Sequence, residues 1–330
     1  KGKRIFILLL TSIIAFTFAS CGGKKTTEAD VQNGAYVYVP TFTLIRDEKK
    51  NLNMINYHLN GEKLYYSLNT HNPEMTEKDY SIVTVDVADG SKTETLEVQG
   101  PQVDGCQSNM NGFRIDEEGN IYVLYDVWPD YVPGEIYGDE DYSTYLTKYE
   151  SNGNKVYEQN LRELLKDKNS SYIQGFQIGK EGKLFVACNN VIYIIGSDGV
   201  PQMNIPTQAE WINGLVATED GKLFYSQTGS TDEGMELVEI NTEKKTSGTV
   251  YKNLPEVSNL IRSGSDGKFL IKGSSFLYEY DMETQEPLPV LKWSDSNITA
   301  DYVGDMVKLQ NGNFLLFYKD GVKGSAEIVK

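Results

Sequence analysis

Short runs of hydrophobic residues recur along this chain, and most of them follow a polar residue and a glycine. The phrase is clearest in "EDGKLF" at Gly221, and the intervals between copies range from 39 residues (182 to 221) to 63 residues (119 to 182). Glycine accepts the positive φ of a tight turn, so each phrase predicts a hairpin turn between two strands. The other copies are "EEGNIY" (Gly119), "KEGKLF" (Gly182), "SDGKFL" (Gly267), "QNGNFL" (Gly312) and the looser "LNGEKLYY" (Gly61).

Two more strands follow each of these hairpins, as in "VIYIIGSDG" and "VPQMNI". The repeating unit is therefore four antiparallel strands in about 40 to 60 residues, a length typical of propeller blades. Six copies predict an all-β fold, a β-propeller of six four-stranded blades, with seven blades as the other count. A β-sandwich is the competing fold, because the spacing is irregular. The convincing helical stretch, "NLRELLKDK" (160–168), falls in a connection.

The last repeat stops at its third strand, so the ring lacks one strand. We expect "GAYVYVP" (34–40), which precedes the first repeat, to supply this strand and to remove an exposed edge. We assign residues 34–330 to the propeller. Because "SAEIVK" ends the chain as the middle of a strand would, we expect the C-terminus to be truncated, and the initial Lys1 suggests a fragment at the other end.

The N-terminal segment has the pattern of an export signal. Lys1, Lys3 and Arg4 precede an apolar run that ends in small residues, and "FASC" matches a lipobox. We predict a lipoprotein signal peptide over 1–20, lipidation of Cys21, and a flexible tether over 21–33. The alternative is an ordinary signal peptide with a chance cysteine. The predicted location is the extracellular face of the cytoplasmic membrane, with the membrane contacted through the anchor on Cys21.

Charge and cysteine content narrow the function classes. The chain carries 31 basic and 47 acidic residues, a net charge of −16, which excludes a basic footprint for nucleic acid and disfavours binding to anionic lipid. Cys106 and Cys188 are too few for a disulfide framework, and we expect two buried free thiols. We expect no cofactor and no metal, because "GDED" (138–141) lacks the spacing of a calcium loop.

A recurring set of polar and aromatic residues precedes each recurring glycine. Carboxamides stand eight residues before it in five of six repeats, and aromatic residues stand ten before it in three. Radial symmetry would gather them at one mouth of the central channel, where they could bind a sugar or a peptide. Turn chemistry and water-bonded amides explain the same residues without a ligand. The candidates are Asn111, Tyr172, Gln174, Trp211, Asn213, Asn259 and Tyr302.

The second repeat contains a long insertion, residues 126–144. Its aromatic residues Trp128, Tyr131 and Tyr137 lie in a stretch rich in proline, glycine and acidic residues. Loops of this length are often functional. The insertion could cover the channel mouth or contact a partner, or it could be a solvated decoration.

Catalytic motifs are absent from the sequence. The only histidines are His58 and His71, and no nucleophile elbow, metalloprotease motif or phosphate-binding loop occurs. We therefore expect a binding module that is not an enzyme. A scaffold for protein–protein interactions at the cell envelope is one alternative, and a propeller lyase or glycosidase is another.

The lipobox, the polar tether and the "DGxL[FY]" repeats together resemble β-propeller lipoproteins of Gram-positive bacteria, in particular the propeller region that precedes the solute-binding domain of ABC importers. The resemblance covers residues 18–330 and no residue motif for a site accompanies it. It implies capture of a nutrient or glycan at the cell surface, with an importer permease as partner and a solute-binding domain beyond Lys330.

Overall fold

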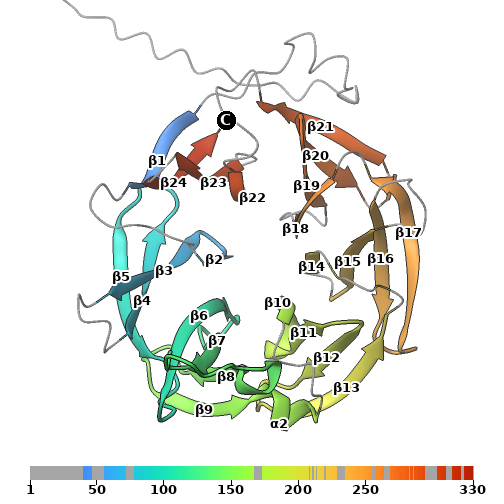
Figure 1. Ribbon diagram of the computed structural model, residues 1–330. Helices are drawn as coiled ribbons and strands as arrows, with labels where there is room; N and C mark the ends of the chain where they lie inside the picture. The colour runs from blue at the N-terminus through green and yellow to red at the C-terminus, as the bar shows by residue number, and fades with distance from the viewer. Residues whose placement is uncertain are drawn as a thin grey trace, which may run out of the picture.

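The strands form an all-β propeller in which four-stranded antiparallel sheets surround a common axis (Figure 1). This computed structural model describes residues 40–46, 56–71, 78–166, 173–207, 209, 212, 214–218, 221–228, 235–254, 257–263, 268–281, 283–284, 286–293, 303–309, 314–320 and 323–329. The predicted propeller with four-stranded blades is confirmed, and the competing sandwich is wrong.

Among the described residues, five blades are built from strands that are consecutive in the chain, rather than the six or seven expected. In each, the first strand is innermost and the fourth is outermost (Figure 1). Their strands are β2 (Tyr57–Asn60), β3 (Lys63–His71), β4 (Lys78–Asp86) and β5 (Lys92–Gln99); β6 (Cys106–Ile115), β7 (Ile121–Pro129), β8 (Ser143–Tyr149) and β9 (Lys155–Asn160); β10 (Ile173–Ile178), β11 (Leu184–Cys188), β12 (Val191–Ile195) and β13 (Pro201–Pro206); β14 (Gly214–Ala217), β15 (Leu223–Thr228), β16 (Met235–Asn241) and β17 (Thr246–Leu254); and β18 (Val257–Ser263), β19 (Phe269–Gly273), β20 (Phe276–Asp281) and β21 (Glu286–Lys292).

A further four-stranded sheet joins the two ends of the described chain. Its strand order is β1-β24-β23-β22, and β1 pairs antiparallel with β24. An N-terminal strand thus completes a sheet as predicted, but it occupies 40–46 rather than 34–40, and residues 34–39 lie outside the described part of the chain. The strands are β1 (Pro40–Arg46), β22 (Val303–Lys308), β23 (Phe314–Asp320) and β24 (Lys323–Val329).

Hydrophobic clusters between neighbouring sheets hold the ring together. The consecutive residues Leu223, Phe224 and Tyr225 of β15 show how: Leu223 and Tyr225 pack against the blade before, and Phe224 packs against the blade after. Both faces of the strand are buried, which is why the sequence shows an unbroken apolar run instead of alternation. The last cluster joins Leu64 of β3 to Leu315 of β23, so the packing continues around the ring.

The recurring glycines lie where the sequence placed them. Gly61, Gly119, Gly182 and Gly221 have φ values of 59°, 84°, 67° and 86°, a region that favours glycine. Gly267 and Gly312 are outside the described residues. The short helical segments are α2 (Leu161–Leu165), inside the predicted helical stretch, and the 3₁₀ turns η1 (Asp139–Asp141) and η2 (Lys180–Gly182).

Several predictions about the chain ends and the thiols can be compared with the described residues. The signal peptide, Cys21 and the tether lie outside them. Within them, no helix is both long and apolar enough to cross a membrane. Cys106 and Cys188 are free thiols as expected, although Cys106 is only partly buried.

Candidate functional site

The carboxamides that recur eight residues before the glycines occupy β-bulges on the innermost strands. In β6, Met110 pairs with Tyr125 and Gly112 with Leu124, so Asn111 is an extra residue without a partner. Gln174 is the extra residue of β10 in the same way. A bulge breaks the ladder locally and redirects a side chain, and bulges are common beside functional sites.

Two other innermost strands have irregularities at the matching position. Gly304 is the extra residue of β22, between the paired residues Val303 and Asp305. In β18 the pairing is interrupted between Val257 and Ile261, a stretch that includes Asn259. The side chain of Asn259 lies outside the described part of the structure. The recurring polar position therefore corresponds to a recurring bulge.

The bulge keeps two successive residues away from the core. Met110 and Phe113 are buried, with 3% and 0% of their surface exposed, while Asn111 between them is exposed and Gly112 is half-buried. In a regular strand, one of these two central residues would face the core. The carboxamide is thus directed away from the hydrophobic packing that surrounds it.

Hydrogen bonds between neighbouring strands place the bulges at one end of the ring. Gln174, near the start of β10, accepts a hydrogen bond from the backbone N–H of Ile212, which lies just before β14. At the opposite end, Asn60 of β2 donates to the carbonyl of Asp116, just after β6. Innermost strands therefore begin at the same end. Gln174 is next to the start of β10, and Asn111, midway along the longer strand β6, is at the equivalent position, eight residues before its turn glycine. We call this end of the ring the bulge end.

Asn111 belongs to a polar cluster with Asp126 and Thr144. Thr144 Oγ1 donates to Asp126 Oδ1 over 3.3 Å, and the Asn111 side chain hydrogen-bonds the same carboxylate. Burial raises the pKa of Asp126 above its usual range, and the two hydrogen bonds oppose this shift. Because a carboxamide has two N–H donors and one acceptor oxygen, this contact leaves part of the Asn111 amide for a ligand.

Gln174 also has hydrogen-bonding capacity that the fold does not use. Its Oε1 accepts from the Ile212 N–H at 3.1 Å, which fixes the amide between two blades. Its Nε2 is buried and has no hydrogen-bond partner among the described residues. A buried N–H without a partner costs free energy, so this group is a natural donor to a ligand or to water.

The glycines that follow the carboxamides differ in their surroundings. A Cβ added to Gly175 would lie 2.9 Å from Cβ of Leu215 in the next blade. A Cβ added to Gly112 would meet nothing within 4 Å. The innermost strands β10 and β14 are therefore crowded at Gly175, and no such crowding occurs at Gly112.

Four of the predicted ligand-binding residues lie outside the described part of the chain: Tyr172, Trp211, Asn213 and Tyr302. Their part in a site stays a prediction. The structure thus brings Asn111 and Gln174 to one end of the ring and leaves the aromatic half of the prediction untested.

A second polar row on the innermost strands was missed in the sequence. Arg114 of β6 donates from Nε to Gln177 Oε1 of β10 over 3.1 Å, and its guanidinium lies 5.6 Å from the centre of the Phe176 ring. His58 of β2 lies on the other side of this arginine. Burial and the nearby Arg114 lower the pKa of His58 to about 3, so the imidazole is neutral at pH 7.

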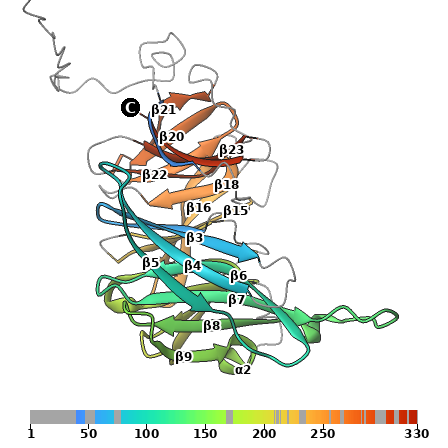
Figure 2. The ribbon, with the colours of Figure 1, turned by 90° about the vertical axis from the view of Figure 1, so that its left-hand side faces the viewer.

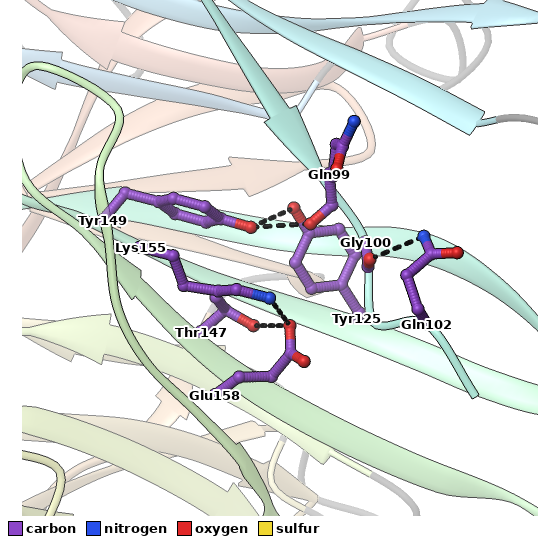
Figure 3. A network of polar contacts seen from close by, with 8 residues as sticks. All are labelled: Gln99, Gly100, Gln102, Tyr125, Thr147, Tyr149, Lys155 and Glu158. Carbon is purple, nitrogen blue, oxygen red and sulfur yellow. Dashed lines mark hydrogen bonds and ion pairs between the residues drawn. The ribbon is translucent and has the colours of Figure 1, made fainter.

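Away from the axis, a tyrosine hydroxyl of the second blade hydrogen-bonds the first blade. Tyr149 O–H donates to the Gln99 carbonyl over 2.7 Å, and its oxygen lies 3.4 Å from that of Tyr125 (Figure 3). Glu158 pairs with Lys155 at 3.0 Å in the same region (Figure 3). Burial raises the pKa of Tyr149 to about 12, so this hydroxyl stays protonated and serves structure.

The predicted loop is an extension of the hairpin formed by β7 and β8. Trp128 lies within β7 opposite Gln107, so it belongs to the blade rather than to the loop. Tyr137 is half-buried, while 79% of the Tyr131 surface is exposed. Since Cys106, the first residue of β6, pairs with Pro129, the loop leaves the blade at the bulge end.

Comparison with known proteins identifies the fold and no family. No protein-family model matches the chain, and no curated protein matches it. An oligogalacturonate lyase in complex with manganese is similar with a TM-score of 0.52 and 11% identity, over 89% of this chain and 97% of that one.

Two further solved structures are similar with lower scores. A luciferin-regenerating enzyme has a TM-score of 0.49 and 9% identity, over 94% of this chain and 95% of that one. The extracellular domain of a one-component system of B. thetaiotaomicron has a TM-score of 0.48 and 13% identity, over 86% of this chain and 34% of that one. At these identities, the similarities concern the fold alone.

The expectation that the protein is not an enzyme is wrong as a conclusion from the sequence. The similar structures include an enzyme, the oligogalacturonate lyase. The missing motifs were a poor guide, because a propeller collects functional side chains from separate blades and needs no contiguous motif. The described residues contain no cluster of side chains that could hold a metal ion. The expectation that the protein binds no metal stays a prediction.

Proposed function

We propose that this protein is a ligand-binding propeller of the cell surface that captures a neutral, hydroxyl-rich ligand, such as an oligosaccharide, at the bulge end of the ring. The observation that carries the proposal is the pair of bulge carboxamides. Asn111 is exposed at its bulge, and Gln174 has a buried Nε2 without a partner among the described residues. Both keep hydrogen-bonding capacity that the fold does not use.

The chemistry of these groups fits hydroxyl groups well. A carboxamide donates and accepts in the same plane, and a sugar hydroxyl does both as well. The net charge of −16 disfavours polyanionic ligands, which leaves neutral glycans as the better class. We further propose that the sugar stacks on the aromatic rings of Tyr172, Trp211 and Tyr302.

The cellular setting is part of the same proposal. Lipidation of Cys21 would hold the propeller on the extracellular face of the cytoplasmic membrane, as in Gram-positive lipoproteins, with residues 21–33 as tether. Captured nutrient would then pass to the permease of an ABC importer. Labelling with a radioactive or clickable fatty acid tests the anchor, because Cys21→Ala should abolish the label.

The binding site is tested with purified protein and a panel of cello-, xylo-, manno- and galacto-oligosaccharides. We expect one class to raise the Tm of the parent protein, and we expect Asn111→Ala and Gln174→Ala to reduce that shift. Asn152→Ala is the matched control, since this exposed asparagine lies in the turn between β8 and β9, at the other end of the blade. Equal shifts in all variants would overturn the site, and no shift with any sugar would overturn the ligand class.

The same samples are analysed for reaction products. Cleavage of a panel member that Asn111→Ala slows would place turnover at the bulge end. Cleavage that neither carboxamide variant affects would show that the reaction does not take place at the bulge end.

A further inference from the structure

A finger of residues 130–142 extends the hairpin of β7 and β8 beyond the rest of the ring (Figure 2). Such a segment is expensive to keep ordered unless its own contacts hold it. Hydrogen bonds within the finger and to the rest of the blade give it a defined shape.

The tip of the finger is a tight turn that its sequence specifies. The backbone N–H of Glu135 donates to the Val132 carbonyl at 3.1 Å, and Gly134 has a φ of 91°. Proline followed by a glycine with positive φ is the sequence of a type II turn, which Pro133 and Gly134 provide. Below the tip, Tyr137 Oη donates to the Asp130 carbonyl at 2.8 Å and accepts from the Val132 N–H at 3.2 Å.

The base of the finger is fastened by an arginine from a different part of the blade. The guanidinium of Arg162 donates to the carbonyls of Asp139 and Glu140, at 2.7 and 2.9 Å. Asn160 caps helix α2 by accepting from the Arg162 N–H at 2.9 Å, and this positions the arginine. The finger is thus held at its tip, along its length and at its base.

The side chains on this ordered finger are unusually apolar for an exposed segment. Ile136 is 97% exposed, Tyr131 is 79% exposed and Val132 is 43% exposed. Single exposed apolar residues are common, but three within six positions of one projecting turn form a patch that a partner would cover. The contacts described above hold the backbone of the finger, while these three side chains stay exposed to solvent.

The charge of the finger limits what that partner can be. The finger contains no lysine or arginine, and its carboxylates are Asp130, Glu135, Asp139, Glu140 and Asp141. A second copy of this chain would bring two acidic fingers together, and an anionic lipid surface would repel the finger. The complementary surface is an apolar depression surrounded by lysine and arginine side chains.

We infer that the finger docks into a partner protein whose surface has an apolar pocket ringed by basic residues. Ile136 and Tyr131 fill the pocket, and the carboxylates contact its rim. This interaction is separate from ligand capture at the carboxamides, so each can fail without the other.

The experiment cross-links the finger in cells that make the full chain. Ile136→p-benzoylphenylalanine is compared with Val156→p-benzoylphenylalanine, because Val156 is also exposed (51%) but lies on outer strand β9. The cross-linked protein is identified, purified and titrated against the parent, against the double variant Ile136→Ser with Tyr131→Ser, and against the control Val200→Ser, which is 55% exposed in another blade. Parallel samples are sedimented with vesicles of phosphatidylglycerol and phosphatidylcholine.

We expect one protein to cross-link at position 136 and not at 156. Its affinity should fall about tenfold or more in the double variant, as at interface hot spots, and stay unchanged in Val200→Ser. Affinity should also weaken between about 50 and about 500 mM NaCl, because salt screens the attraction between the finger's carboxylates and the basic rim of the pocket. A cross-link to a second copy, vesicle binding that depends on Ile136, equal cross-linking at both positions, or an affinity indifferent to the double variant would each overturn the inference.

Discussion

The second blade contains two polar residues whose hydrogen bonding differs: Asp116 at the turn that follows β6, and Asn111 at the bulge within β6. Asp116 opens the turn at Gly119 and is 92% removed from solvent, with 8% of its surface exposed. Its carboxylate accepts from the backbone N–H groups of Glu118 and Asn120, at 3.0 and 2.8 Å, and from the Tyr122 hydroxyl at 3.1 Å. Every one of these donors belongs to the same hairpin.

Asn111 and Gln174, which occupy the recurring carboxamide position, are satisfied only in part. Asn111 reaches one carboxylate, Asp126, and Gln174 has a buried Nε2 without a partner among the described residues. The difference separates a structural polar group from a candidate ligand-binding one. A polar group whose hydrogen bonds all close within its own hairpin serves the fold, whereas one with unused hydrogen-bonding capacity is available for a ligand.

Asp116→Ala is expected to cause the largest loss of stability. The substitution leaves two backbone N–H groups and a buried tyrosine hydroxyl without their acceptor, so the free energy of unfolding should fall by about 2–3 kcal/mol. Urea denaturation measures the change. Glu117→Ala, an exposed carboxylate in the same turn, is the control and should cost little. Equal stability of Asp116→Ala and the parent would show that Asp116 does not stabilise the fold.

A smaller loss is expected from Gly175→Ala. Its new Cβ would press on Leu215, which the packed innermost strands do not allow, so unfolding should become easier by about 1–3 kcal/mol. Gly112→Ala, at the matching position of the previous blade, meets open space and should change stability little. Equal stability of the two variants would show that β10 and β14 are not crowded at Gly175.

The pH dependence of stability should report His58. Its folded-state pKa of about 3 lies below the ordinary 6.5, so the unfolded chain binds the proton first and stability falls as pH drops from about 6.5 to about 3. His58→Gln should remove about 1 kcal/mol of this acid-induced loss, a figure reduced for partial exposure. His71→Gln serves as the control. Identical slopes for both variants, from urea midpoints at several pH values, would contradict the neutral imidazole.

The smallest change in stability is expected from Asn111→Ala. The side chain is exposed and contacts Asp126, so its loss should cost less than about 1 kcal/mol. The same variant should nevertheless lose most of its response to the ligand. A large loss of stability, measured by urea denaturation, would instead place Asn111 with Asp116 among the structural residues.

The sequence was a good guide where a local pattern determines local structure. Positive φ at Gly119 and Gly221 and the double-sided run of Leu223, Phe224 and Tyr225 follow from residue type and neighbours alone. The closing strand was misplaced, because "GAYVYVP" and the observed PTFTLIR stretch are both plausible strands and only the pairing with β24 selects one.

The candidate site was harder to predict than the fold. A bulge is a mismatch in count between two strands, so Asn111 and Gln174 could be recognised as recurring but not as unpaired. Arg114 and Gln177 both stand five residues before their glycines (119 − 114 = 5 and 182 − 177 = 5), and this signal in the sequence was overlooked. Their contact depends on how neighbouring blades are stacked, which spacing alone does not give.

Ligand capture at the bulge end is tested most directly by a crystal structure of the protein with the oligosaccharide that raises its Tm. We predict ligand density at the bulge end, with sugar hydroxyls within hydrogen-bond distance of the Asn111 amide and of Gln174 Nε2. Density on the outer strands or on the finger, with both carboxamides untouched by the sugar, would contradict it.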